Sequence, residues 1–430
     1  TPPMDDLWQP FIDLVRAPRA LWGINFAYTL EGWVYFGMLG YLAMHFSDFV
    51  FQGVPDPDVH SHHMVMVLTA GITIAMFFLG SVADRRGVRK TLLAAFVLLL
   101  LGRIVWSAAP SVLPETGLWN GMHLMTMAGI LLVVVGYGMY QPAAYAGVRQ
   151  FTSPRTAAMS YAMLYALMNL GGWLPSFFSP VRQSYGITGA FWVYTGITVL
   201  ALLSTGIILT RKVEQRAIVR AEKERQEEAA RAAAAAAAST ATVRHRVPVH
   251  LWVTLLVIAA SAFLLPAPWS WAIGGPLLAV LAVLAFLPGR VRTAYIWLAN
   301  HPLGDPKFFF FIFALIPVQT LFTYNWLVLP QYLERAYEGG VVSEKFEVFA
   351  NLNPILIFFA VPMVTALTQK RKVYNMMILG TFVMAAPAFL LAFGTSLLLL
   401  LGYLIIMTIG EGMWQPRFLQ YAAEIAPDGR

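Results

Sequence analysis

The chain has 430 residues, of which 58% are hydrophobic and only 12% are charged, and it contains no cysteine. Charged residues make up roughly a quarter of an ordinary soluble protein, so this composition excludes one and indicates a chain that crosses a membrane several times. The absence of cysteine excludes disulfides and thiolate metal sites. The net charge of +7 does not indicate nucleic acid, because most of the 29 lysines and arginines lie in loops on one predicted side of the membrane.

This asymmetry of charge predicts the location of the protein. We expect an integral protein of a bacterial inner membrane, with a cytoplasmic N-terminus and with membrane lipids but no nucleic acid among its partners. Three cations, Arg182, Arg335 and Lys345, fall on the outer side, whereas Arg103 and Arg417 lie within predicted spans. No cleavable signal peptide is visible, and we expect a few residues to precede Thr1.

The first half of the chain is predicted to form a six-helix bundle over residues 20–210, after an N-terminal cytoplasmic or interfacial segment at 1–19. A membrane span needs ~20 apolar residues, and each of six runs is long enough. An acidic stretch at 47–63, without lysine or arginine, is predicted to be an outer loop. The six runs are 20–46, 64–83, 91–109, 121–148, 157–179 and 187–210.

The second half begins with a charged, alanine-rich segment at 211–249 that predicts a solvated cytoplasmic linker helix. A regulatory or partner-binding helix is the alternative interpretation. An inserted transmembrane hairpin is predicted at 250–287, from runs at 250–266 and 271–287. A C-terminal bundle over 288–430 then shows four more spans, which gives twelve in total. These four spans are 306–332, 348–369, 373–393 and 396–422.

A basic turn between the second and third apolar runs carries a recognisable pattern. It resembles the Gly-x-x-x-Asp-Arg-x-Gly-x-Arg-Lys loop between helices 2 and 3 of the major facilitator superfamily. The resemblance implies an all-α polytopic membrane protein with two helical bundles around a central cavity, an extra hairpin between the halves, and two last helices not seen in this chain. The residues that carry it, as a gating or conformational motif, are Gly80, Asp84, Arg85, Gly87, Arg89 and Lys90.

Two carboxylates inside predicted spans are the first candidates for chemistry, because a charge in the bilayer costs several kcal/mol unless it is paired or lines a cavity. Glu31 shares a helical face with Tyr28 and Tyr35 and is a candidate proton carrier. The alternative for Glu31 is a structural role, bonded to neighbouring Tyr or Asn. Glu411 lies between glycines and before Pro416, where we expect the helix to break or bend.

Five further motifs resemble the proton-dependent oligopeptide transporters. They are EGWVYFG at 31–37, GYGMYQP at 136–142, YALMNLG at 165–171, NPILI from 353 with a proline at 362, and GEGMWQP at 410–416. The resemblance implies proton coupling at Glu31 and Glu411. The residues expected to bind substrate, some by position and others as polar residues within spans, are Tyr28, Tyr35, Gln141, Asn169, Gln319, Asn353 and Gln415.

Two departures from that pattern bear on the substrate. The family has Arg where this chain has Gly32 and Lys where it has Gln141, and those cations are expected to hold a peptide carboxylate. Peptide selectivity is therefore in doubt, while a proton site and an amine-binding carboxylate remain. A neutral or cationic metabolite fits the missing cations better than a peptide does.

No enzyme, cofactor or metal is predicted. The sequence contains no Walker A loop, nucleophile elbow or HExxH motif. A metal cluster in the outer loop is an alternative interpretation, but its spacing fits no closed tetrahedral site. The residues in question are Asp56, Asp58, His60, His62 and His63.

The sequence therefore predicts a secondary transporter for a small solute or short peptide, working by alternating access as a proton symporter. Protonation of Glu31 or Glu411 would begin each loading step. The rival hypothesis is a transport-inactive subunit that scaffolds a membrane complex through a protein partner.

Overall fold

The computed structural model describes residues 18–152, 154–233, 246–264, 288–299, 301–368 and 373–425, and every regular element in these ranges is helical. Three predicted segments lie wholly or largely outside these residues. They are the N-terminal segment at 1–19, the second run of the inserted hairpin at 271–287, and the chain's last residues from 426.

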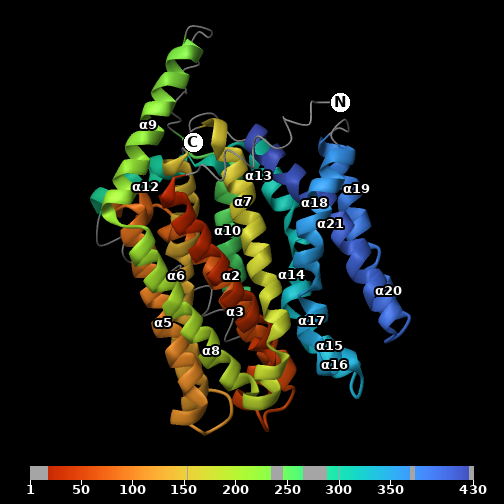
Figure 1. Cartoon of the computed structure of the whole chain (residues 1–430). Coiled ribbons are helices and arrows are strands. Elements are labelled where there is room, and N and C mark those ends of the chain that lie inside the picture. The colour runs from red at the N-terminus through yellow and green to blue at the C-terminus, as the bar shows by residue number, and fades with distance from the viewer. Residues whose placement is uncertain are drawn as a thin grey trace. The chain divides into compact units, whose positions relative to one another are not determined.

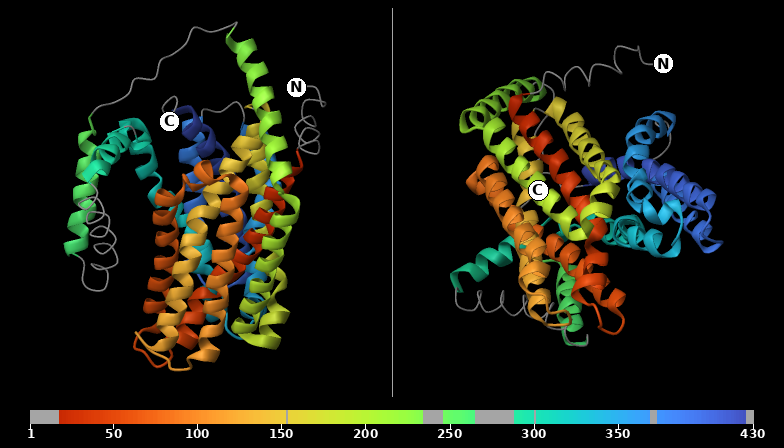
Figure 2. Two further views of the ribbon diagram at one scale, coloured as in Figure 1. Left: turned by 90° about the vertical axis from the view of Figure 1, so that its left-hand side faces the viewer. Right: turned by 60° about the horizontal axis from the view of Figure 1, so that its bottom comes forward.

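The first-half helices pack into a bundle in which α5 lies against α6 and α8, α2 lies against α7 and α8, and α3 lies against α6. Two further views show the same helices, red to yellow-green, running side by side (Figures 1 and 2). The six long helices correspond to the six predicted spans. Their bounds are α2 (Arg19–His45), α3 (Pro57–Leu79), α5 (Val88–Val112), α6 (Gly121–Phe151), α7 (Pro154–Trp173) and α8 (Ser179–Ile208).

Part of the predicted outer loop at 47–63 is helical. The chain continues from α2 into a short π-helix, η1 (Phe46–Val50), and α3 already begins at Pro57. Proline is favoured in the first turn of a helix, because its fixed φ suits that turn and its missing N–H is not needed there. The loop prediction was therefore wrong for 57–63, and the three histidines of this stretch lie on α3.

Small residues allow the bundle helices to approach closely. A Cβ on Gly102 of α5 would lie 2.6 Å from the carbonyl oxygen of Gly129, and a Cβ on Gly129 of α6 would lie 2.7 Å from that of Gly102. Any side chain at either position would force α5 and α6 apart. This is the small-residue packing typical of helices in membranes.

Several later helices are shorter than the predicted runs, because prolines divide those runs. The run at 306–332 forms three helices, the last two beginning near Pro317 and Pro330, which cannot donate a backbone hydrogen bond within a helix. The bounds are α9 (Arg211–Ala233), α10 (Val249–Leu264), α12 (Pro288–Ala299), α13 (Pro306–Ala314), α14 (Ile316–Leu327), α15 (Leu329–Ala336), α16 (Val341–Glu344), α17 (Phe346–Ala350), α18 (Leu352–Thr368), α19 (Val373–Ala385), α20 (Ala388–Ala392) and α21 (Leu397–Ile425). Short elements are α4 (Val82–Arg86), η2 (Leu174–Phe177) and η3 (Pro302–Gly304).

We expected the helix around Glu411 to break or bend, and it does not break. Helix α21 runs without interruption through Gly410, Gly412 and Pro416. A proline inside a helix removes one backbone hydrogen bond, and in membrane helices neighbouring groups often compensate for that loss. The helix prolines Pro110 of α5 and Pro142 of α6 are accommodated in the same way.

Seven segments of the described chain are long and apolar enough to cross a membrane, judged by length and composition. They begin at residues 57, 88, 121, 179, 306, 374 and 397. Helix α2 is not among the seven, and it carries Asn25 and Glu31, whose side chains are buried inside the protein. These segments support an integral membrane protein.

The chain forms two compact units by its internal contacts. The first comprises residues 1–236, 322–369 and 382–412, and its core contains large side chains with almost no exposure, such as Phe96 and Phe191. The second comprises 237–321, 370–381 and 413–430. One small apolar cluster of the second unit is formed by Phe311, Leu315, Met377 and Trp414, and another by Val247, Leu251 and Ala299.

Candidate functional site

Glu411 of α21 is fully buried in the first unit, where two other helices supply its partners. Asn353 of α18 donates a hydrogen bond from Nδ2 to Glu411 Oε2 at 2.8 Å. The hydroxyl of Tyr165 on α7 donates to Glu411 Oε1 at 3.4 Å. Two residues expected to share a site, Asn353 and Glu411, are thus in direct contact. We regard this group of residues as the candidate functional site.

The orientation of the Asn353 amide follows from its second contact. The Thr408 hydroxyl donates to the carbonyl oxygen of Leu404 at 2.6 Å, so toward Asn353 it can only accept. Asn353 Nδ2 lies 3.0 Å from Thr408 Oγ1 and therefore gives its two hydrogens to Thr408 and Glu411. Asn353 Oδ1 is buried and has no hydrogen-bond partner among the described residues. A buried acceptor without a partner is costly and calls for an explanation.

One face of α21 continues the polar site. Tyr403, Met407 and Glu411 recur at intervals of four, which places them on one side of the helix. The Tyr403 hydroxyl donates to Asn325 Oδ1, and Asn325 Nδ2 lies 3.3 Å from Met407 Sδ. The predicted residue Asn169 contacts the site indirectly, through a 2.9 Å bond from its Nδ2 to the Tyr165 carbonyl.

Close helix packing fixes the position of Glu411. A Cβ on Gly410 would lie 2.7 Å from Met384 Cα and from the carbonyl carbon of Val383, both on α19. Only glycine allows this approach. The residue before the buried carboxylate is therefore held against the backbone of a neighbouring helix.

Glu31 is buried too, but it is part of an ion pair. Arg103 of α5 donates from Nη1 to Glu31 Oε2 at 2.8 Å and from Nη2 to Oε1, which is a two-bond arrangement. Arg103 Nη1 also donates to Thr198 Oγ1 of α8 at 2.7 Å, and the Tyr137 hydroxyl of α6 donates to Glu31. The environment of Glu31 therefore fits the alternative of a structural role. Its main partner is Arg103, which we had not assigned to it.

The structure also explains one departure from the oligopeptide-transporter pattern. A Cβ on Gly32 would lie 2.9 Å from the carbonyl oxygen of Met168 on α7, so an arginine would not fit there. The cation beside Glu31 comes from Arg103 instead. Its position inside the predicted span at 91–109 was the signal, but the sequence did not indicate which carboxylate it would meet.

The other predicted substrate residues are distributed over both units. Tyr28 stacks on Tyr140 with ring centroids 5.6 Å apart, and Tyr35 packs on Tyr137 at 4.9 Å. Gln141 is partly buried next to Tyr140 on α6. The last two predicted substrate residues, Gln319 and Gln415, are partly buried residues of the second unit.

A third buried carboxylate, Glu347 of α17, is held by the first-half helices. It accepts hydrogen bonds from Tyr41 Oη at 2.9 Å, Ser179 Oγ at 2.7 Å and Arg182 Nε at 2.5 Å. The Arg182 guanidinium also lies 4.8 Å from the centre of the Phe346 ring, in cation–π geometry. Glu347 is thus neutralised by its own arginine, as Glu31 is.

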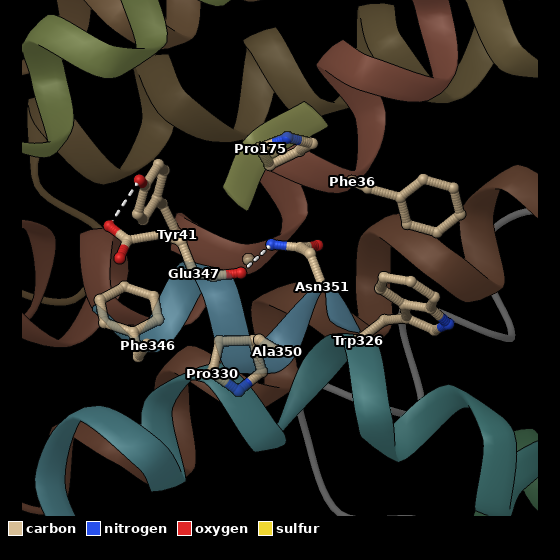
Figure 3. Close-up of a pocket in the computed structure, with 11 residues that line it drawn as sticks. Phe36, Tyr41, Pro175, Trp326, Pro330, Phe346, Glu347, Ala350 and Asn351 are labelled. Atoms are coloured by element: carbon tan, nitrogen blue, oxygen red, sulfur yellow. Dashed lines mark hydrogen bonds between the residues drawn. The ribbon is translucent and has the colours of Figure 1, made fainter. Parts of the chain in front are cut away.

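A small cavity lies beside Glu347 (Figure 3). Phe36 of α2 and Trp326 of α14 lie on one side of it, with ring centroids 4.3 Å apart. Asn351 lines it as well and donates from Nδ2 to the Glu347 carbonyl oxygen at 2.7 Å. The cavity is therefore mainly apolar, and the carboxylate at its edge already has its donors.

Arg335 of α15 forms a further ion-pair cluster. It pairs with Asp58 of α3 and with Asp48 of η1, the latter at 3.1 Å. Partial burial opposes its charge, but the hydrogen bond and the charge of Asp58 outweigh burial and raise the pKa of Arg335. The pKa of the adjacent Glu334 is raised by burial and then by the charge of Asp48.

The basic turn is joined to other helices. Asp84 pairs with Arg149 of α6 at 2.6 Å rather than with an arginine of its own loop. The start of α5 is capped by Glu214 of α9, which accepts from the Arg89 backbone N–H at 2.9 Å. Gly87, at φ 88°, adopts the left-handed backbone that glycine tolerates. Gly80 begins the turn, and Arg85 and Lys90 are exposed.

The linker helix α9 is only partly solvated, which differs from our expectation. Its Ala217 and Ala221 are buried, and the helix contacts α6 and α2 of the bundle. Arg225 donates to the carbonyl oxygens of Arg149 and Thr152, the second at 3.0 Å. The first turns of α9 thus belong to the first-half bundle.

The outer histidines give no metal centre within the described part of the chain. No three His, Cys, Asp or Glu side chains there lie close enough to hold an ion. The His60 and His63 rings are 6.2 Å apart, and His123 accepts from the Trp119 backbone N–H at its Nδ1 atom at 3.0 Å.

Comparisons with known proteins agree with this architecture. The family model described as Major Facilitator Superfamily matches residues 21–430. The structure of the POT family transporter PepTSo is similar with a TM-score of 0.66 at 16% identity, over 95% of this chain and 84% of that one. A POT family transporter in complex with 5-aminolevulinic acid is similar with a TM-score of 0.59 at 17% identity, over 96% and 85%. A comparison with curated protein sequences gave no match.

Proposed function

Because the chain belongs to the Major Facilitator Superfamily, we propose that it is a proton-coupled secondary transporter that moves a small solute by alternating access. The solute class includes short peptides, and the carrier lies in a bacterial inner membrane with its N-terminus in the cytoplasm. Transport, rather than catalysis, is the function that the family and the buried polar site support together.

One observation supports Glu411 as the proton-binding group. Of the three carboxylates that are buried in the described part of the chain, Glu31 and Glu347 each have an arginine, whereas the described partners of Glu411 are all neutral. A buried carboxylate without a counter-charge is strongly disfavoured, so it takes up a proton or the cation of a ligand. This is the behaviour that a coupled carrier requires. Our expectation that Glu31 carries the proton has less support, because Arg103 already neutralises it.

Alternating access needs contacts between the two halves that can form and break. Within the first unit, Arg182 pairs with Glu347, and Arg335 pairs with Asp48 and Asp58, so that each pair joins a first-half helix to a later one. The pairs of Arg335 are partly exposed and exchange protein contacts for water at modest net cost. Glu347 is buried, so its pair with Arg182 opens at low cost only if water reaches the carboxylate. These ion pairs are suitable contacts for a closed end of the carrier.

The test is solute-driven proton movement in proteoliposomes that contain a pH-sensitive dye. We expect a mixed set of di- and tripeptides and small amines to change the internal pH with the native protein and not with Glu411→Gln. Glu115→Gln, at an exposed loop position, is the matched control and keeps native behaviour. If no solute moves protons with folded native protein, the scaffold hypothesis replaces this one.

A further inference from the structure

The site around Glu411 carries information about the solute itself. We infer that the transported solute is an organic cation with N–H donors and no carboxylate, and that it exchanges for a proton at Glu411. This inference rests on the proposed function. It names the solute class and changes the expected coupling from symport to exchange.

The first argument is the complementarity of hydrogen bonds. The site offers two acceptors, the Glu411 carboxylate and the unpartnered Asn353 Oδ1, and both are buried. An ammonium group has three donors and no acceptor, so it would satisfy both atoms at once. A carboxylate on the solute has acceptors only and would leave Asn353 Oδ1 without a partner.

The second argument is the charge of the buried and half-buried side chains. In the first unit, Arg103 is bound to Glu31, Arg182 to Glu347, and Arg335 to two aspartates. Each of these guanidinium groups already has its anion. Among the described residues around Glu411, none supplies a second cation for a carboxylate on the solute. A zwitterionic peptide would therefore have to bury its carboxylate unpaired, which is costly.

The third argument concerns the exchange. The groups that face Glu411 are Tyr165 from α7 and Asn353 from α18, together with Thr408 of its own helix, and none of them is charged. One carboxylate can be neutralised by one proton or by one monovalent cation at a time. Binding then follows the balance COOH plus R-NH₃⁺ giving COO⁻ with R-NH₃⁺ plus one released proton.

A proton symporter would need a second carboxylate free to carry the proton while the solute occupies the first. Glu31 and Glu347 are the other buried carboxylates of the described chain, and each is held by an arginine. The solute and the proton therefore use the same atom group in turn. In a carrier that alternates its access, such competition produces movement in opposite directions.

The experiment compares probes that differ by one carboxylate. The pairs are agmatine with arginine, phenethylamine with phenylalanine, and alanyl-alaninamide with alanyl-alanine. Proteoliposomes are prepared with an acidic interior, and both the uptake of each probe and the loss of internal protons are measured. We expect at least one cation of the three to enter while protons leave, and its carboxylate-bearing partner to enter at least about tenfold more slowly.

Three variants test the roles of Glu411 and Asn353. Glu411→Gln is expected to abolish the exchange, and Asn353→Ala to weaken binding of the transported cation by about tenfold, because a hydrogen bond to a charged group is lost. Glu411→Asp, which keeps the carboxylate, should retain part of the exchange. Elution of each variant as a single species in detergent shows that it is folded.

The outcomes separate this inference from the proposed function. Glu411-dependent uptake of the carboxylate-bearing probes together with protons would overturn the inference and leave the proposed function intact. Movement of the probes that is unchanged in Glu411→Gln would contradict both. A folded native protein that moves none of the six probes in either direction would also contradict both.

Discussion

Glu31 and Arg103 form a buried charge pair whose groups have further hydrogen-bond partners. Both side chains are almost fully buried, with exposures of 1% and 2%, and Thr198 and Tyr137 satisfy further lone pairs and protons. A buried pair of this kind gives little net stability over an apolar one, but removing one partner leaves an uncompensated charge. The pair therefore ties α2 to α5 while remaining sensitive to single substitutions.

We expect Arg103→Met to destabilise the protein by about 3–5 kcal/mol, because Glu31 would remain buried without its cation. The double variant Glu31→Gln with Arg103→Met should recover most of this loss. Thermal unfolding of the detergent-solubilised variants measures both. A single variant as stable as the native protein would show that the pair is not formed.

Glu334 predicts a dependence of stability on pH. The pKa of Glu334 is raised in the folded protein by burial and by the charge of Asp48. Its contribution to stability is therefore fully present below the pKa of the unfolded chain, about 4.3, and is lost as the pH rises through the pKa of the folded protein. Glu334→Gln stays neutral and should raise the thermal midpoint at pH 7. The difference should vanish near pH 4, and an equal difference at both pH values would contradict this assignment.

At the scale of elements, contacts between helices decide where the functional groups lie. Helix α21 is straightforward to predict from its apolar length, but its approach to α19 at Gly410 depends on the absence of a side chain. The sequence of α9 likewise predicts a solvated helix and does not indicate that its Glu214 caps α5. In both cases the pattern of one helix gave no information about its neighbour.

Gly410→Val is expected to disrupt the packing of α21 on α19, because its side chain would overlap the Met384 backbone. The yield of folded protein and its thermal stability should both fall sharply. Gly196→Ala on α8 is the matched control, since nothing lies within 4 Å of its Cβ position. It should be neutral or slightly stabilising, because alanine favours helix more than glycine does. Equal behaviour of the two variants would contradict the close approach.

At the scale of the whole molecule, the proposed alternating access would require ion pairs that join early and late helices to open during the cycle. Arg182 and Glu347 are separated by 165 residues in sequence and meet through α8 and α17. Tyr41 adds a bond from α2 to the same carboxylate. This point is therefore suitable for testing whether the early and late helices separate.

Because the chain has no cysteine of its own, a single introduced cysteine is the only thiol that a maleimide can label. Ala350→Cys places a thiol at the wall of the cavity beside Glu347, where the native side chain is 4% exposed. Adding Arg182→Gln should raise its maleimide labelling rate in detergent by about tenfold, the ratio that corresponds to losing about 1.4 kcal/mol of a charged hydrogen bond. A background of Arg220→Gln, an exposed arginine of α9, should leave the rate unchanged. No change with Arg182→Gln would show that this ion pair does not hold the contact closed.

The sequence by itself determined the class of protein and most helix positions, and it indicated two residues of the candidate site, Glu411 and Asn353, but not Tyr165 or Thr408. Apolar length is enough to predict spans, and polar residues within spans stand out because the bilayer makes them costly. Glu411 was found in this way, whereas Asn353 was assigned from the resemblance to the oligopeptide transporters. The prolines that divide the run at 306–332 were also visible, although we had not used them as helix ends.

Only the tertiary structure decided which charges neutralise each other. Glu31 and Arg103 lie 72 residues apart, and Tyr165 and Glu411 lie 246 apart, so no periodicity of a single helix relates them. A carboxylate within a span has the same sequence signature whether it faces an arginine or a neutral amide. The difference between a structural carboxylate and an exchangeable one depends on distances of a few ångströms between helices, and those distances are set by packing.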